Sequence, residues 1–153
     1  MLQDMLWNMA RISGAKTRRA SSWDKTGGNW DWWTVKPGEE RILAKIKGPV
    51  CITHIWMTQG ADLDSAAFKK GLIKVRQAET DMLRKILVKI RWDGEKNPSV
   101  LAPLGDFFCL GHATVNSFCS LPFTASTAAN NTRSMMVALN CYLPMPFNGS
   151  AEI

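Results

Sequence analysis

The residue types best suited to chemistry cluster between Arg18 and Asp31, in the segment Arg-Arg-Ala-Ser-Ser-Trp-Asp-Lys-Thr-Gly-Gly-Asn-Trp-Asp. Hydroxyls, carboxylates, an amide and indoles surround a Gly-Gly pair there. Because Ser, Asp, Asn and Gly favour turns, we expect a loop. Indoles stack on the apolar face of a sugar ring, and carboxylates and amides hydrogen-bond its hydroxyls. Composition favours equally a sugar-binding loop and a structural loop whose Trp side chains are anchored in the core.

The cysteines do not form a recognisable metal-binding or disulfide pattern. Cys51, Cys109, Cys119 and Cys141 each stand alone within apolar runs. This arrangement predicts buried, free thiols in a reducing compartment, and therefore a cytoplasmic protein. The spacing of Cys109 and His112 is compatible with half of a zinc site, but no second close pair completes it. We therefore expect no metal site.

Length and charge narrow the class of protein. The chain has 153 residues, which fits one domain with a sizeable core, and a formal net charge of +6. The basic residues are dispersed apart from a short cluster at 16–19, so they predict solvated surfaces and argue against a nucleic-acid interface. No apolar run reaches the roughly 20 residues that span a bilayer, and the N-terminus lacks a signal-peptide pattern.

The elements that must position the loop are mostly strands. Extended segments are predicted at 32–35, 41–47, 50–58, 84–92, 99–104, 117–123 and 135–143, with a loop at 124–133. Apolar residues at helical spacing predict a short amphipathic helix over 1–12 and an inserted helix over 61–82. Short strands between turn signals predict an all-β, antiparallel β-sandwich, with a jelly roll as the leading topology. We assign 1–20 to the helix and lead-in and 21–153 to a single domain.

The segment 50–58 is apolar on both faces and predicts a central strand covered on both sides. His54 lies within this segment. We expect it to be a hydrogen-bonded core histidine rather than a catalytic base.

Four blocks together resemble one family. They are Arg19–Asn29, Gly48-Pro49 with Ile52–Thr58, Trp92–Glu95 with Pro98–Val100 and Pro103–Phe108, and Asn140–Tyr142 with Pro144–Phe147. In this order they resemble the DUF2961 proteins, glycoside hydrolase family 172. The resemblance implies a double jelly roll per subunit, symmetric oligomers, and hydrolysis or transfer at furanosides such as α-D-fructofuranosides or D-arabinofuranosides. It also implies a retaining mechanism with paired glutamates and no cofactor.

The resemblance implies that the catalytic glutamates lie in a second half that follows the last matched block. No residue of this sequence matches them, so we assign no catalytic residue and expect the chain alone to be inactive. Retaining cleavage needs two carboxyl groups roughly 5 Å apart, and no spacing here identifies such a pair.

The candidate substrate-binding residues are Trp23, Asp24, Asn29 and Trp30. Asp24 would accept hydrogen bonds from sugar hydroxyls, Asn29 would donate and accept, and a Trp would stack. The expected function is the N-terminal jelly-roll part of a furanoside-acting enzyme, which supplies a sugar-binding loop and oligomer-interface residues. The alternatives are a self-assembling structural protein (a shell, ring or filament) and a carbohydrate-binding module without catalysis.

Overall fold

The computed structural model describes residues 11–12, 14–59, 70, 81–127 and 137–153. The chain divides into two units, Met1–Leu43 and Ala44–Ile153. The described part of the first unit is irregular and includes a turn at 25–28, so the loop expected at 18–31 is confirmed. The segment 32–35, predicted to be extended, forms no assigned strand.

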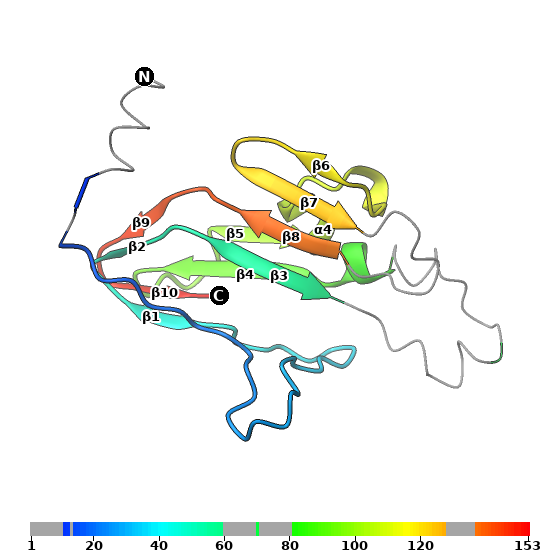
Figure 1. Ribbon diagram of the computed structural model, residues 1–153, viewed down its shortest axis with the longest axis horizontal. Coiled ribbons are helices and arrows are strands. Elements are labelled where there is room, and N and C mark those ends of the chain that lie inside the picture. Colours follow the sequence, from blue (N-terminus) through cyan, green and yellow to red (C-terminus); the bar gives the residue numbers. More distant parts are fainter. Residues whose placement is uncertain (1–10, 13, 60–69, 71–80, 128–136) are drawn as a thin grey trace. The chain divides into compact units, whose positions relative to one another are not determined.

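The described residues of the second unit form short strands, the short helical segments α4 and η1, and a helical turn at 81–85 (Figure 1). In chain order the elements are β1 (Lys45–Lys47), β2 (Val50–Ile52), β3 (Ile55–Gln59), β4 (Leu87–Trp92), β5 (Val100–Pro103), α4 (Leu104–Phe107), η1 (Gly111–Ala113), β6 (Phe118–Cys119), β7 (Phe123–Thr127), β8 (Val137–Cys141), β9 (Met145–Phe147) and β10 (Ser150–Glu152). All strand pairs are antiparallel. The predicted all-β, antiparallel sandwich is therefore confirmed, whereas its jelly-roll topology stays a prediction.

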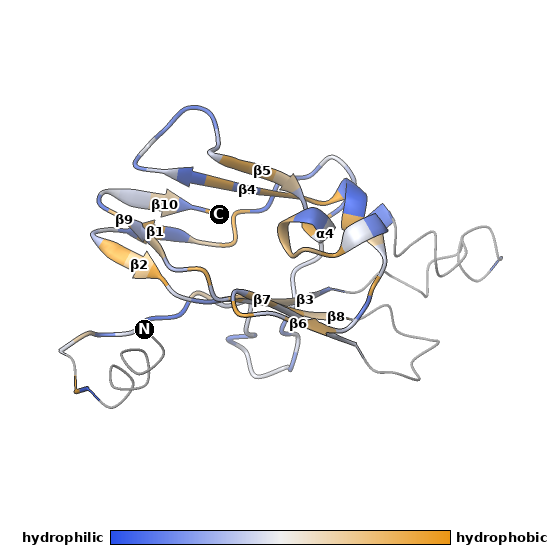
Figure 2. Ribbon diagram, turned by 90° about the horizontal axis from the view of Figure 1, so that it is seen from above, coloured by the Kyte–Doolittle hydropathy of each residue, from blue (hydrophilic) through white to orange (hydrophobic). Residues whose placement is uncertain are grey.

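The strands form two layers (Figure 2). One layer has the order β1-β10-β4-β5, the other has the order β3-β8-β7-β6, and β2 pairs with β9. Three of the pairings are nested, because β1 pairs with β10, β2 with β9 and β3 with β8. The first three strands therefore pair, in reverse order, with the last three.

The core between the two layers explains why these segments become strands. Inward side chains alternate along β4 and β8, where Ile90, Val137, Leu139 and Cys141 are fully buried. They pack in one cluster with Phe108, which follows α4. Residues that alternate with period two can only bury one face, so this pattern fixes the register of each strand.

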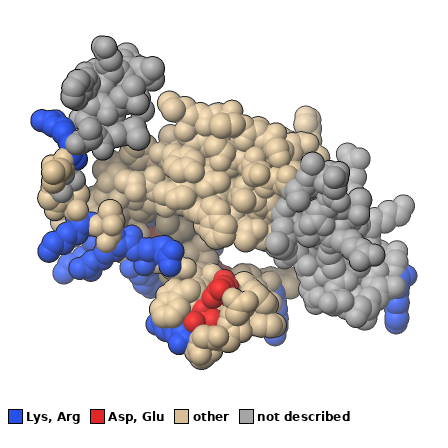
Figure 3. All heavy atoms as spheres, viewed as in Figure 1, with Lys and Arg blue, Asp and Glu red and all other residues tan. Residues whose placement is uncertain are grey.

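The outward positions of the two layers differ in chemistry. We call the outward positions of β1-β10-β4-β5 the charged face; they include Lys45, Lys47, Lys89, Arg91 and Glu152. We call the outward positions of β3-β8-β7-β6 and its margin the uncharged face; they are His54, Trp56, Thr58, Ala138, Asn140, Tyr142, Thr124, Ser126 and Cys119. Figure 3 shows no Lys, Arg, Asp or Glu over β7 and β8 on this side.

Several predicted boundaries are corrected. The strand expected at 41–47 begins at Lys45, and the strand expected at 84–92 begins at Leu87 because 81–85 are helical. The predicted loop at 124–133 overlaps β7, and β9 and β10 were not predicted. The predicted helices over 1–12 and 61–82 lie almost entirely outside the described residues.

The segment 50–58 is the largest correction. It forms two strands, β2 and β3, and among the described strands β3 lies at the end of its sheet instead of at the centre. His54, which lies between them, is exposed and not a core residue. Three of the four cysteines are exposed, and only Cys141 is buried. The cysteines are apolar enough for a core, but no described part of the chain covers the three exposed ones.

Candidate functional site

The carboxylate of Asp24 organises the loop at 22–31. Its Oδ1 accepts hydrogen bonds from the backbone N–H (2.8 Å) and the hydroxyl (2.7 Å) of Thr26. Its Oδ2 accepts a hydrogen bond from the backbone N–H of Trp30 (3.2 Å). These bonds favour the ionised form, so the hydrogen bonds from Thr26 and Trp30 lower the pKa of Asp24. Both carboxylate oxygens therefore hold the loop together.

Asp31 closes the same loop from its other end. Its Oδ1 accepts a hydrogen bond from the backbone N–H of Asp24 (2.7 Å), and its carbonyl oxygen accepts one from the Ser22 hydroxyl (2.6 Å). All of these contacts join residues at most nine positions apart. The loop is thus defined by local hydrogen bonds, as its Ser, Asp and Thr content predicts.

The glycines and Asn29 give the backbone its shape. Gly27 and Asn29 both have left-handed φ angles, of 77° and 60°, which Gly and Asn adopt most easily. A Cβ at Gly28 would lie 2.9 Å from Asp24 Oδ2. The Gly-Gly pair therefore lets the backbone pass close to the Asp24 carboxylate.

The indoles of this loop are exposed. Trp23 is 54% exposed and Trp30 is 65% exposed, and the Trp30 ring lies 4.0 Å from that of Trp32. The structure thus brings together Asp24, Asn29 and Trp30 within one loop, with the Trp23 indole open to solvent beside them. Exposed indoles next to an amide and a hydrogen-bonded carboxylate are compatible with stacking on a sugar ring.

A second polar centre lies where three turns of the sandwich meet. Asp93 Oδ1 accepts hydrogen bonds from the backbone N–H groups of Gly149 (2.6 Å) and Ser150 (2.9 Å). The N–H of Gly48 donates to the carbonyl of Gly149 (2.8 Å). Hydrogen bonds from Ser150 and Gly149 lower the pKa of Asp93. This corner holds together turns that are more than 50 residues apart in sequence.

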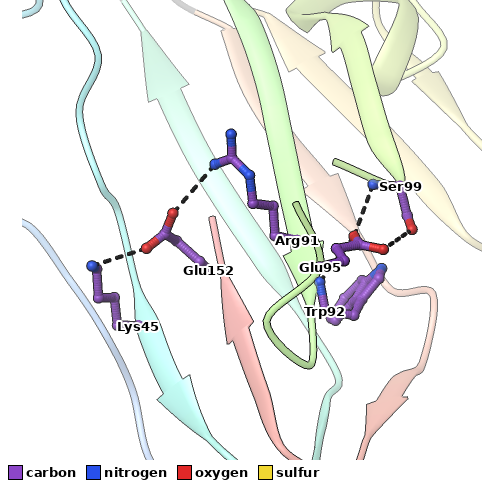
Figure 4. Close-up of polar contacts among 6 residues, drawn as sticks. All are labelled: Lys45, Arg91, Trp92, Glu95, Ser99 and Glu152. Carbon is purple, nitrogen blue, oxygen red and sulfur yellow. Dashed lines mark hydrogen bonds and ion pairs between the residues drawn. The ribbon is translucent and has the colours of Figure 1, made fainter. Parts of the chain in front are cut away.

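The Glu95 carboxylate is likewise occupied by hydrogen bonds within the fold (Figure 4). Its Oε1 accepts hydrogen bonds from the backbone N–H groups of Trp92 (3.0 Å) and Ser99 (2.9 Å), and its Oε2 accepts one from the Ser99 hydroxyl (2.7 Å). The Ser99 and Trp92 bonds lower the pKa of Glu95. The carboxylate thus stabilises the connection between β4 and β5.

The uncharged face carries a polar and aromatic group that sequence reasoning missed. The rings of His54 and Tyr142 stack with centroids 4.5 Å apart and an interplanar angle of 2°. Asn140 Oδ1 accepts hydrogen bonds from His54 Nε2 (3.0 Å) and from the Tyr142 hydroxyl (3.4 Å). Trp56 is directly opposite Asn140 in the β3·β8 pairing. Only the strand register brings these residues together, so no local sequence signal identified them.

Comparison with known proteins decides the family. The family model described as GH172 domain-like matches residues 30–153, which is most of the chain. The chain belongs to the GH172 domain-like family. No curated protein matches it. The match starts at residue 30, so Trp30 lies within it, whereas Trp23, Asp24 and Asn29 lie before it.

In this GH172 domain-like chain, four carboxylates accept hydrogen bonds that favour their ionised form. The pKa values of Asp24, Asp93, Glu95 and Glu152 all lie below their ordinary values, and hydrogen bonds are the leading cause in each case. A general acid in glycoside hydrolysis needs a raised pKa. These four carboxylates therefore have the opposite tuning to a general acid.

The described residues contain neither a metal-binding cluster nor a membrane-spanning helix. No group of three or more His, Cys, Asp or Glu side chains among them is arranged to hold a metal ion. None of the helices in the described ranges is both long and apolar enough to cross a membrane.

Proposed function

We propose that residues 1–153 form the N-terminal jelly-roll part of a furanoside-acting glycoside hydrolase. In this role they supply a sugar-binding loop and residues of a subunit interface, and the catalytic glutamate pair comes from another segment. The observation that carries the proposal is the GH172 domain-like match over residues 30–153. Hydrogen bonds lower the pKa values of Asp24, Asp93 and Glu95, which is the opposite of what a general acid needs and supports the assignment of catalysis elsewhere.

The loop around Asp24 is the sugar-binding element of this proposal. Trp23 and Trp30 offer exposed rings for stacking, and Asn29 offers an amide that donates and accepts hydrogen bonds. Asp24 contributes mainly by holding the loop in shape, since its oxygens already accept bonds from Thr26 and Trp30. The sugar contacts therefore fall chiefly on the rings and on Asn29.

Calorimetric titration of the purified chain with short fructo- and arabino-oligosaccharides tests the loop. We expect Trp23→Ala to weaken binding and leave the unfolding transition unchanged, because the indole is exposed. Val35→Ala, an exposed apolar residue in the same unit, is the matched control and should bind as the parent does. If Trp23→Ala binds sugar normally, or if it loses its thermal transition, the loop is structural.

An activity assay tests the assignment of catalysis. We expect no turnover of nitrophenyl furanosides by the purified chain. Turnover that disappears on substitution of one of its own carboxylates would show that a catalytic pair lies within these residues.

The strand order favours one alternative, self-assembly. β3 ends its sheet, and no described strand pairs with its second edge over Ile55–Gln59. An open edge is a template for pairing with another chain, and repeated pairing builds rings, shells or filaments. Light scattering at micromolar concentration discriminates the two functions, because a stable monomer rules out a shell or filament.

A further inference from the structure

We propose that the uncharged face is a second carbohydrate-binding surface, centred on Trp56 and Asn140, which binds a short neutral furanose oligosaccharide. The proposal rests on the proposed function only for the class of ligand. Its residues all lie in the unit Ala44–Ile153, whereas the loop around Asp24 lies in the unit Met1–Leu43. The two sites can therefore be tested separately.

Two aromatic rings of the uncharged face are exposed to solvent. Trp56 is 58% exposed and Tyr142 is 44% exposed, although both lie on or beside the paired strands β3 and β8. The near-parallel stack on His54 fixes the ring plane of Tyr142. A ring held by a stacked neighbour, as Tyr142 is by His54, loses little conformational entropy when a ligand binds, which favours stacking on a sugar.

The polar groups between the rings have unused hydrogen-bonding capacity. The Oδ1 of Asn140 is occupied by His54 and Tyr142, but its amide nitrogen donates to no described residue. The outward hydroxyls of Thr58, Thr124 and Ser126 likewise make no hydrogen bond within the described chain. Trp56, Asn140 and Thr124 form one row across three strands. This row places an aromatic ring, an amide donor and a hydroxyl side by side.

The lack of charge selects the class of ligand. The uncharged face carries no Lys, Arg, Asp or Glu among the described residues (Figure 3). A nucleic acid or an acidic peptide would find no cation to pair with its negative charges. A neutral sugar needs none, because its hydroxyls pair with amides and hydroxyls and its C–H groups contact the rings.

The same polar groups argue against a second copy of the chain as the occupant. Burying the Asn140 amide and three hydroxyls under a dry protein interface would leave them without partners, which is unfavourable. A sugar brings donors and acceptors on every ring carbon and satisfies them. We therefore assign the face to a carbohydrate and treat self-association as an outcome of the test.

The test uses the full chain and two probes, an inulin-type fructo-oligosaccharide and a linear arabino-oligosaccharide. Two-dimensional NMR of indole N–H groups reports each Trp separately, and we expect the Trp56 signal to shift on titration. Trp56→Ala should weaken this binding by about tenfold, the size of an aromatic contact. Leu101→Ala is the matched control, since Leu101 is an exposed apolar residue on the outward side of the other layer.

The outcomes separate this site from the loop. If the Trp56 signal shifts and still shifts in Trp23→Ala, the second surface is confirmed independently of the loop. If sugar shifts only the Trp23 and Trp30 signals, the face is not a sugar site, although the proposed function survives. If neither probe shifts Trp56, or if Trp56→Ala instead breaks up an oligomer in light scattering, the proposal is overturned and the face serves another purpose.

Discussion

The two outward faces of the sandwich use the same strand geometry for different chemistry. On the charged face, Lys45, Glu152 and Arg91 lie in one row across three strands and are joined by ion pairs of 2.9 and 3.3 Å (Figure 4). On the uncharged face, the corresponding row is Trp56, Asn140 and Thr124. The charges of the first row are paired with one another and hydrated by solvent. The second row exposes the Trp56 ring beside polar groups, and exposed Trp and Tyr rings are enriched at binding surfaces.

The comparison depends on the assignment of inward and outward positions, and the largest expected effect tests it. Leu139 is fully buried on β8 and Trp56 points outward on the adjacent strand. Leu139→Ala should lower the free energy of unfolding by about 2–5 kcal/mol, because it leaves a cavity in the core. Trp56→Ala should change it by only about 0.5 kcal/mol or less, as expected for a surface position. Urea denaturation of both variants measures the difference.

A large loss of stability in Trp56→Ala would contradict the comparison. It would mean that the ring is buried in solution, either by part of this chain or by another copy. A parallel measurement at two protein concentrations distinguishes these cases, since only burial by another copy depends on concentration.

The next largest effect on stability is expected at the connection between the two layers. The chain passes from β1 in one sheet to β2 and β3 through Gly48, where an added Cβ would lie 2.5 Å from the carbonyl oxygen of Asn148. Backbone cannot move aside as a side chain can, so Gly48→Ala should lower the free energy of unfolding by about 1–3 kcal/mol. Gly111→Ala, where nothing lies within 4 Å, is the control and should be close to neutral.

Much of the charged face could be predicted from the sequence, and little of the uncharged one. In β4, Lys89 and Arg91 alternate with Val88 and Ile90, so the pattern itself indicates which side of the strand faces solvent. In β3, Trp56 alternates with Ile55 and Met57, so both sides look buried. Hydrophobicity indicates which residues avoid water in isolation, but not whether the fold provides a neighbour to cover them.

The shortest strands were missed because their own residues do not favour strands. β10 is Ser-Ala-Glu, and it becomes a strand because β1 and β4 flank it on both sides. β9 contains Pro146, which predicts an end of the strand; it pairs only with β2 in a two-stranded ladder, where a proline is tolerated. Their partners lie far away in sequence, so local patterns carried no signal.

The candidate site shows the same limit. The turn-forming residues predicted the loop around Asp24, but not that both oxygens of its carboxylate would be used within the loop. The group of His54, Asn140 and Tyr142 depends on a contact across 86 residues. Such a group follows from strand register, which single-sequence reasoning does not supply.

Acid should weaken the charged face and the corner at Asp93. The hydrogen bond from Lys45 is the main cause of the lowered pKa of Glu152, and backbone hydrogen bonds lower that of Asp93. Because the folded state holds these carboxylates ionised, their stabilisation is complete above their ordinary pKa values of about 4 and is lost as the pH falls below them. The midpoint of thermal unfolding should therefore drop at acid pH, and less steeply in Asp93→Asn. An identical pH profile in that variant would show that the corner does not contribute.

The smallest expected effect concerns salt, and one titration can separate the two faces. Lys45→Met removes an ion pair between an exposed lysine and a half-buried Glu152 at the surface, so it should lower stability only slightly. That small difference should vanish near 1 M NaCl, where the screening length is about 3 Å. Sugar binding at Trp56 should persist in the same salt, because neither the ring nor the amide of Asn140 carries a charge. If salt abolished that binding, charged residues would have to take part in it, and the distinction between the faces would fail.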